Sequence, residues 1–360
     1  MRILGILGIL GMVALSLGAA WDPRLAARYL DNREQEWLAW PAAKTVTGAA
    51  CISCHTGAPY LLARPALRRV LGEVDPTPGE TALLTSLRAR DAISDAREIK
   101  RGFTTEPMAA QALGVEAVYA SLFLTLTDTG GVSLNSDAQK AFDRLWTLQN
   151  TAGPSRGAWP WFNLGLDPYE MPVSPFYGAA LAALAAGSAP AEYRALPAVR
   201  QHMAELIAYF AREVRAQPLH NRLMLLWASS KLPDALPESA RQSTIDEIWR
   251  KQEADGGWTI ASLGPWDPQP GAPASPGSNS YATGLVACVL LAVDVRSADP
   301  RLARALTWLA SHQDRQAGYW EAHSMNKPYE PGSMPAQFMR DAATAFAVLA
   351  LSESWNETGK

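Results

Sequence analysis

An internal repeat constrains the fold of this 360-residue chain more than any other feature of the sequence. In each of three copies, a helix-like segment ends in a Gln that follows a Trp, and a short turn then carries Gly and a second Trp. The copies run over residues 141–159, 245–258 and 306–320. A very apolar segment follows each copy, at residues 176–186, 281–293 and 342–351. Such a repeat predicts helical hairpins that stack on one another and share a core.

Apolar residues recur with helical spacing along nearly all of the chain after residue 20, and strand-like alternation is scarce. The spacing predicts twelve helices, at residues 23–39, 61–71, 79–100, 107–127, 136–150, 175–187, 195–216, 219–230, 238–252, 280–293, 299–312 and 339–353. Twelve helices make six hairpins, in which outer helices of mixed polarity cover apolar inner helices. We expect each repeat Gln to hydrogen-bond the exposed end of the next helix and each Trp to fill the wedge between hairpins.

The repeat resembles the Gln-Trp repeats of the prenyltransferase and squalene–hopene-cyclase superfamily. The resemblance covers roughly residues 79–355 and implies an all-α fold, an α/α toroid of paired inner and outer helices. It does not extend to the chemistry, because the Asp-x-Asp-Asp acid of squalene–hopene cyclases is missing from the sequence. The Asp-x-Cys zinc ligands of protein prenyltransferases are missing too, since Val286 stands two positions before Cys288. The resemblance therefore supports the fold and assigns no activity.

The first twenty residues have the pattern of a secretory signal peptide. Arg2 supplies the positive charge, residues 3–17 are apolar, and residues 18–20 are small enough for cleavage. A retained N-terminal anchor is the alternative. No later stretch has the length and apolar character that we expect of a membrane span. We therefore expect a periplasmic or secreted protein whose mature chain has no transmembrane segment.

After the signal peptide at residues 1–20, we expect residues 21–78 to form an N-terminal helical segment and residues 79–360 to form the toroid repeats. The two parts are expected to make one compact domain. Lys and Arg together number 32 and Asp and Glu together 35, which gives a formal net charge of -3. A nucleic-acid-binding protein needs a basic face, so this balance argues against a nucleic-acid partner.

Cys51, Cys54 and His55 form a Cys-x-x-Cys-His motif, which is the spacing of covalent c-type haem attachment. The two thiols would add to the haem vinyl groups and His55 would be the proximal iron ligand, giving one haem c. Predicted export agrees with this, because c-type haems are attached outside the cytoplasm. The residues leave open a Cys51–Cys54 disulfide, a redox-active thiol pair and a zinc site. Cys288 lies in an apolar segment and is expected to be a buried hydrophobe.

The segment from Cys51 to Arg68, joined to these repeats, also resembles uncharacterised bacterial secreted proteins that are described as squalene-cyclase-like or cytochrome-c-like. Within it, Arg64 and Arg68 follow the motif at helical spacing. Arg makes strong bidentate contacts to carboxylates, so both are candidate partners of the haem propionates. A solvated helix face is the alternative for the same two residues.

The order of helices predicts where the motif lies. If residues 23–39 pair with residues 61–71, the loop at 40–60 joins the two helices of the first hairpin. Loops inside hairpins lie at one end of an up-and-down toroid, so this loop would meet the long loops at residues 151–174, 253–279 and 313–338. Loops of this length are uncommon in compact domains and are often functional.

Three residues expected at this end are candidates for the sixth iron ligand: Met171, His220 and Met325. The same loops carry carboxylates at Asp167, Glu170, Asp255 and Asp267. Two carboxylates across a cavity can act as a general acid and a general base, which offers a different chemistry. The spacing selects no pair among them.

The leading hypothesis is an exported monohaem c-type cytochrome-like protein. Its work would be electron transfer or haem-based redox chemistry, with an apolar ligand site at the mouth of the barrel, and its partner a redox protein or a small-molecule ligand. One alternative is a terpene-cyclase-like or other α/α-barrel enzyme, and another is a non-catalytic binding module. In both, the motif would be a disulfide or a structural haem site.

Overall fold

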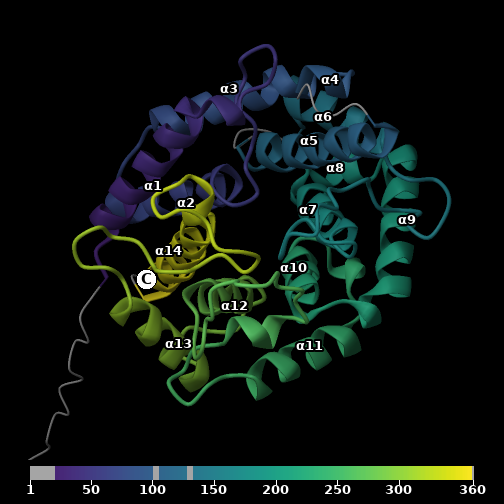
Figure 1. The fold of residues 1–360 in the computed structure, drawn as a ribbon. Coiled ribbons are helices and arrows are strands. Elements are labelled where there is room, and N and C mark those ends of the chain that lie inside the picture. The colour runs from purple at the N-terminus through teal and green to yellow at the C-terminus, as the bar shows by residue number, and fades with distance from the viewer. Residues whose placement is uncertain (1–20, 100–104, 128–132, 359–360) are drawn as a thin grey trace, which may run out of the picture.

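The computed structural model describes residues 21–99, 105–127 and 133–358, and the predicted signal peptide lies outside this part of the chain. The fold is the all-α toroid that the sequence predicts (Figure 1). Within these described residues, six inner helices surround the axis and six outer helices surround them. The buried side chains of each inner helix pack against those of its neighbours, so the toroid has one main hydrophobic core.

The twelve longer helices alternate between the two layers. The outer helices are α1 (Pro23–Ala39), α3 (Pro78–Asp91), α6 (Ser136–Thr147), α9 (Pro197–Glu213), α11 (Glu238–Arg250) and α13 (Pro300–Ser311). The inner helices are α2 (Gly57–Leu71), α5 (Glu106–Leu126), α7 (Pro175–Ser188), α10 (Leu219–Ser229), α12 (Ser280–Ala292) and α14 (Phe338–Thr358). Two one-turn helices lie between them, α4 (Ala96–Ile99) and α8 (Ala191–Arg194).

Three predicted boundaries differ from the structure by four residues or more, and one of them is the end of α14, which runs to Thr358 instead of residue 353. Helix α2 starts at Gly57, earlier than expected, because Pro59 lies in its first turn, where a missing N–H costs nothing. The helix predicted to continue to residue 100 ends instead at Asp91. Ile93 there leaves the helix and packs against Ala112 of α5 in a small separate apolar cluster.

Small residues let the inner helices approach closely. A Cβ atom on Gly284 of α12 would lie 2.8 Å from the backbone nitrogen of Ala347 in α14, which leaves no room for a side chain. Helices α7 and α12 are buried on nearly all faces, as expected for helices without a polar side. In turn, α5 packs on α7, α7 on α10, α10 on α12, α12 on α14 and α14 on α2, while α3 contacts both α2 and α5.

The Gln side chains of the repeat join neighbouring hairpins, at the start of the next outer helix as predicted for Gln252 and Gln313, but farther along α9 for Gln149, which donates to the carbonyl of His202 (3.0 Å). Gln252 donates its amide to the carbonyl of Arg301 at the start of α13 (2.8 Å). Gln313 donates to the carbonyl of Asp22 (2.9 Å) and accepts from the backbone N–H of the same residue (2.6 Å). Because Asp22 caps α1, the last repeat closes the ring onto the first helix.

The Trp and Gly of each turn fill the space between hairpins. Trp159, Trp258 and Trp320 are fully buried, and each donates its indole N–H to a carbonyl of the preceding outer helix. The equivalent glycines adopt positive φ angles of 94°, 98° and 85° at Gly157, Gly256 and Gly318. A Cβ atom on any of them would run into the next outer helix, so the turn requires glycine for both conformation and space.

Helix α5 is the one helix in the described part of the chain that is long and apolar enough to cross a membrane. Most of that apolar stretch is buried inside the toroid, where it packs against α6 and α7. A buried core helix has the same length and composition, so α5 is explained by its place in the ring.

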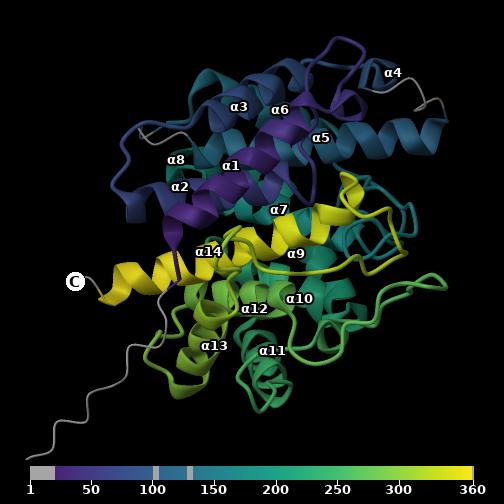
Figure 2. The ribbon, with the colours of Figure 1, turned by 60° about the vertical axis from the view of Figure 1, so that its left-hand side comes forward.

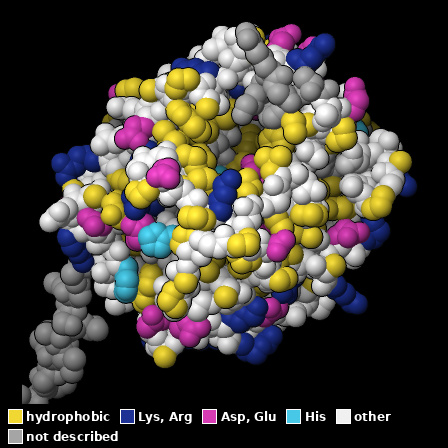
Figure 3. Space-filling view, in the orientation of Figure 1, with side chains coloured by type: hydrophobic (Ala, Val, Ile, Leu, Met, Phe, Trp, Pro, Cys, Tyr) yellow, Lys and Arg dark blue, Asp and Glu magenta, His cyan; other side chains and the backbone are white. Residues whose placement is uncertain are grey.

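The long loops within hairpins gather at one end of the toroid (Figure 2). Asp167 and Asn326 exchange two hydrogen bonds there, from Asp167 N to Asn326 Oδ1 (2.7 Å) and from Asn326 Nδ2 to the Asp167 carbonyl (2.8 Å). Asp167 Oδ2 also accepts from the backbone N–H of Asp267 (2.8 Å). Three loops predicted to share an end are therefore tied to one another, and Figure 3 shows a hollow bordered largely by hydrophobic side chains on this face.

Candidate functional site

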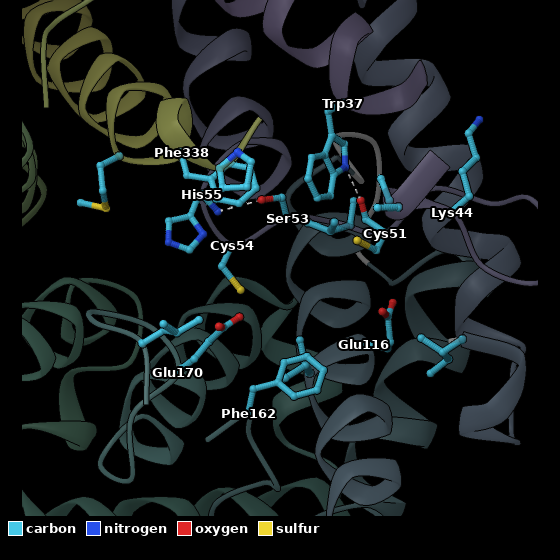
Figure 4. Close-up of a pocket in the computed structure, with 18 of the residues that line it drawn as sticks. Trp37, Lys44, Cys51, Ser53, Cys54, His55, Glu116, Phe162, Glu170 and Phe338 are labelled. Atoms are coloured by element: carbon cyan, nitrogen blue, oxygen red, sulfur yellow. Dashed lines mark hydrogen bonds between the residues drawn. The ribbon is translucent and has the colours of Figure 1, made fainter. Parts of the chain in front are cut away.

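A cavity opens at the loop end of the toroid, and the Cys51–His55 motif lines it (Figure 4). It encloses about 230 Å³ within a total empty space of about 1050 Å³ that includes its mouth. The walls come from the loop before α2, from α5, from the loop after α6 and from the start of α14. The predicted meeting of these segments at one end is confirmed, and the motif lies where they converge.

Short hydrogen bonds fix the backbone of the motif. The indole N–H of Trp37 donates to the carbonyl of Cys51 (2.7 Å), and the backbone N–H of Cys51 donates to the carbonyl of Ala43 (2.8 Å). The Ser53 hydroxyl accepts from the backbone N–H groups of His55 and Thr56, each at 3.1 Å. Ser53 thus satisfies donors at the entry to α2, as short polar residues do at helix starts.

A buried carboxylate anchors the residue after the motif. Asp341 of α14 accepts hydrogen bonds from the Thr56 hydroxyl (2.7 Å), the Tyr29 hydroxyl (2.7 Å) and the guanidinium of Arg33 (2.8 and 3.0 Å). All four side chains are buried or nearly so. The network joins α1, the motif and α14, so the position of His55 depends on the closure of the ring.

A second buried acid, Glu34, lies beside this network. Neither of its carboxyl oxygens has a hydrogen-bond partner within the described residues. Burial raises the pKa of Glu34 well above its usual value, and the nearby Asp341 raises it further. This shift favours the protonated carboxyl, which avoids the large penalty for burying a charge.

Aromatic side chains orient the imidazole of His55. Its ring stacks on Phe338, with centroids 5.1 Å apart and planes inclined by 18°, and meets the edge of Tyr169 at 4.9 Å. Neither ring nitrogen has a hydrogen-bond partner among the described residues. Burial lowers the pKa of His55 to about 4, so the imidazole is neutral near pH 7, the form that binds a metal.

The two motif thiols line the same cavity as the imidazole. The structure does not join Cys51 and Cys54 in a disulfide. Burial raises the pKa of the Cys54 thiol, and the negative charge of Glu170 raises it further. Cys288 is buried in α12, as predicted for a small hydrophobe.

Glu170 stands on the wall that faces the motif. Figure 4 shows its carboxyl directed toward Cys54, with Phe162 on the same side of the cavity. No side chain in the described part of the chain hydrogen-bonds or pairs with this carboxyl. Burial raises the pKa of Glu170 to about 7.

The remaining charged side chains of the cavity are arranged differently. Glu116 of α5 pairs with Arg90 of α3 through two hydrogen bonds, from Nε to Oε2 at 2.9 Å and from Nη2 to Oε1. Lys44 lies exposed at the rim. The cavity therefore has one neutralised acid, one cation at its mouth and one carboxyl without a protein partner.

Arg64 and Arg68 lie outside the cavity lining. Arg64 pairs with Asp31 (3.0 Å) and Glu73 (2.6 Å). Arg68 pairs with Glu80 (2.6 Å), which also takes part in the capping box of α3. The structure thus brings Cys51, Cys54 and His55 together and holds both arginines on carboxylates of neighbouring segments.

The three candidates for the sixth ligand are also placed outside this cavity. Both ring nitrogens of His220 are engaged in the core, Nε2 with the Tyr281 hydroxyl (2.8 Å) and Nδ1 with Asn221 Oδ1 (3.2 Å). Met171 is half-buried beside Glu170, and Met325 lines a neighbouring cavity of about 300 Å³.

Met339 is the methionine that lines the cavity of the motif, and it lines the neighbouring cavity as well. Sequence reasoning missed it, because it begins a predicted apolar helix and resembles an ordinary core residue. Its place at the start of an inner helix, at the end where the loops meet, is the signal that could have found it.

The mouth carboxylates have separate roles. Asp167 ties loops together, as described above, and Asp255 accepts from the Ser278 hydroxyl (2.7 Å) and the Trp308 indole (3.1 Å). Only Glu170 of the four expected mouth acids lines the cavity. Within the described residues, no group of three or more His, Cys, Asp or Glu side chains has the arrangement of a metal site.

Comparisons with known proteins identify the fold and no activity. No protein-family model matches the sequence, and no curated protein matches it. Among solved structures, a polysaccharide lyase superposes with a TM-score of 0.52 at 12% sequence identity. The match covers 94% of this chain and 98% of the lyase chain. The two proteins therefore share the fold over nearly all of both chains.

Proposed function

We propose that the cavity holds one covalently attached c-type haem and that the protein is an exported monohaem cytochrome-like protein. The observation that carries the proposal is that Cys51, Cys54 and His55 all line one cavity. Residues that are contiguous in sequence do not have to share a cavity. If the motif lay on a surface loop, its three side chains would not face one enclosed space.

The donor set of the cavity suits this group. The thiols of Cys51 and Cys54 are not joined to each other, and His55 presents a neutral imidazole without a hydrogen-bond partner among the described residues. Apolar and aromatic side chains make up much of the wall, including Phe162 and Phe338. Lys44 and Arg90 are the cationic side chains of the lining.

Each of these residues would have a defined part. The two thiols would hold the haem by covalent bonds, and His55 would ligate the iron from one side. When bound, a c-type haem supplies a redox-active iron whose potential depends on its ligands and its burial. The aromatic walls would exclude water from it, and the Asp341 network would keep His55 in place from behind. An external redox protein would exchange electrons with it.

The proposal is tested by a pyridine haemochrome spectrum of the full chain, expressed with its own leader and a c-type cytochrome maturation system. We expect a covalent c-type spectrum with about one haem per chain, in protein recovered from the periplasm or medium. The double variant Cys51→Ala/Cys54→Ala should lose the haem. Cys288→Ala is the matched control, since Cys288 is buried in α12, and it should retain the haem.

Two outcomes would contradict the proposal. The first is folded, exported protein without haem, shown by a native circular dichroism spectrum and no Soret absorption. The second is haem content that does not depend on the two motif cysteines. Either result would turn attention to the α/α-barrel enzymes, which share the toroid.

A further inference from the structure

The wall that faces Cys54 carries a carboxyl that nothing in the fold explains. Glu170 is directed into the cavity, and its oxygens have no hydrogen-bond or ion-pair partner in the described residues. The other acid of the lining, Glu116, is bound by Arg90. A half-buried carboxyl without a partner is unfavourable for stability, so its presence calls for a partner that enters the cavity.

The position of Glu170 is fixed by its backbone. Glu170 and Leu166 exchange two backbone hydrogen bonds (2.9 and 3.3 Å), and the Glu170 carbonyl also accepts from Leu164 N (2.8 Å). Inside this turn, Asp167 is held by Asn326 from the loop before α14. The preceding residue, Tyr169, is buried, and its hydroxyl bonds that of Tyr281 (2.8 Å). The carboxyl is therefore presented by a rigid turn.

The protein side chains that would compete for the same face are mostly elsewhere. Both His220 nitrogens are hydrogen-bonded in the core, and Met171 and Met325 do not line this cavity. Met339 does line it, so Met339 is the one thioether ligand that the described lining offers. A bound exogenous ligand needs a side chain in the cavity that can hydrogen-bond it. An iron ligated by a second protein side chain needs no such group.

We propose, on the basis of the haem site proposed above, that the cavity would admit a small exogenous ligand of the haem and that Glu170 hydrogen-bonds that ligand. The ligand class is a two- or three-atom molecule, or a peroxide, whose outer atom accepts a hydrogen bond. Glu170 acts here as a ligand-positioning residue. The protonated carboxyl is the donor, and burial favours this form.

The experiment uses the haem-loaded full chain, with carbon monoxide and cyanide as probes. We expect the reduced protein to bind carbon monoxide, seen as a shift of the Soret band, and the oxidised protein to bind cyanide. Glu170→Leu should weaken cyanide binding about tenfold, the effect of losing one hydrogen bond to a charged group. It should also raise the stretching frequency of bound carbon monoxide, because a hydrogen bond to the outer oxygen lowers that frequency.

Two variants control this measurement. Glu170→Gln keeps an N–H donor and should retain most of the wild-type cyanide affinity. Glu330→Leu removes an exposed acid from the loop before α14 and should change neither readout. Haem content by pyridine haemochrome and the thermal midpoint of each variant separate a lost hydrogen bond from a lost fold.

Specific outcomes would overturn the inference. Haem-loaded protein that binds neither probe has an iron closed by an internal ligand, and recovery of carbon monoxide binding in Met339→Leu would identify that ligand. Unchanged cyanide affinity and carbon monoxide frequency in Glu170→Leu would remove Glu170 from the role. Protein without haem would overturn the proposed function as well, so the two failures are distinguishable. The carbon monoxide test needs only the wild-type protein.

Discussion

The repeat hairpins and the first hairpin hold their places in the same ring by different interactions. Between repeat hairpins, the neutral amide of Gln252 bonds a backbone carbonyl of the next outer helix, and Trp258 fills the space behind it. The first hairpin, α1 and α2, lacks the Gln-Gly-Trp sequence. Its inner helix packs on α14 in the apolar core, and charged groups add a second link, with Arg33 bound to Asp341 in the core.

The difference explains where the candidate site lies. An amide that bonds a backbone carbonyl depends little on which side chains surround it, so the same device serves three times. The Asp341 network depends on four particular side chains, one of which is Thr56, the neighbour of His55. The Gln–carbonyl bond therefore joins hairpins where only closure of the ring is needed. The Asp341 network is used where a wall of the cavity must be held in a fixed position.

The largest expected effect comes from breaking the Asp341 network. Asp341→Ala leaves Arg33 buried without its main partner and frees the hydroxyls of Tyr29 and Thr56, so we expect a loss of about 4 kcal/mol of unfolding free energy. Urea denaturation followed by circular dichroism measures it. A loss below about 1 kcal/mol would show that the network adds little to ring closure.

A double variant separates burial from charge in the same network. Arg33→Met combined with Asp341→Leu removes both partners, and we expect it to be more stable than Asp341→Ala alone. In the haem-loaded protein, both variants should alter the electronic spectrum of the iron, because the anchor of Thr56 is lost in each. A normal spectrum in both would separate the network from the position of His55.

The next largest effect comes from changing a glycine of the repeat turns. Gly318 has a φ of 85°, and a Cβ atom there would overlap the backbone of Leu25 in α1. We expect Gly318→Ala to cost about 3 kcal/mol, from the strained backbone and the clash together. Gly332 has a φ of 78° with open space around it, so Gly332→Ala should cost about 1 kcal/mol. Equal losses in the two variants would mean that the contact with α1 is unimportant.

Gln313 sharpens the comparison, because it joins the last repeat to the first hairpin. Its side chain is buried and bonds Asp22 N, the Asp22 carbonyl and the Gly318 carbonyl. Gln313→Ala should cost about 2 kcal/mol and speed amide hydrogen exchange in α1. Gln252→Ala, at a half-buried position where water can replace the amide, should cost about half as much. The reverse order would show that closure of the ring is not its weak point.

The sequence predicts the helices and their order well, because both follow from local periodicity and a repeated motif. The common end of the loops follows from the pairing of helices, and the Gln and Trp roles follow from their chemistry. After the break at Asp91, Ile93 lies in one apolar cluster with Ala112 of α5, the inner helix of the same hairpin. No local pattern contains that contact, so the prediction of one long helix fails there.

The site divides in the same way. The motif from Cys51 to His55 is contiguous, so its spacing alone identifies it. The helical spacing of Arg64 predicts that it faces a haem propionate. In the structure Asp31 and Glu73 pair with it, and the sequence does not show that these two acids approach it. Glu170 is recognised as a mouth acid, but which wall it faces is decided by the tertiary structure.

A substitution at Glu34 tests whether the buried acids of the first hairpin lower the free energy of unfolding. Burial raises its pKa in the folded state, so the unfolded chain binds fewer protons than the folded one above the ordinary carboxyl pKa. The stability that Glu34 contributes is present below that ordinary pKa and is lost as pH rises toward the folded value. Glu34→Met should remove this pH dependence and stabilise the protein by about 1 kcal/mol at neutral pH, measured by denaturation between pH 4 and 8. A slope that survives the substitution would assign it to another group.

The smallest effect belongs to a second ion pair between the first hairpin and α14. Arg69 and Glu353 are 3.1 Å apart, but their side chains are 57% and 46% exposed, against 3% and 2% for Arg33 and Asp341. Water and salt screen such a pair, so Arg69→Ala should cost less than about 0.5 kcal/mol. A double-mutant cycle with Glu353→Ala, run at low and high salt, measures the coupling. If that coupling approached the effect at Asp341, charge alone would hold the first hairpin. A negligible coupling would show that the Asp341 network holds the hairpin because its charged groups are buried.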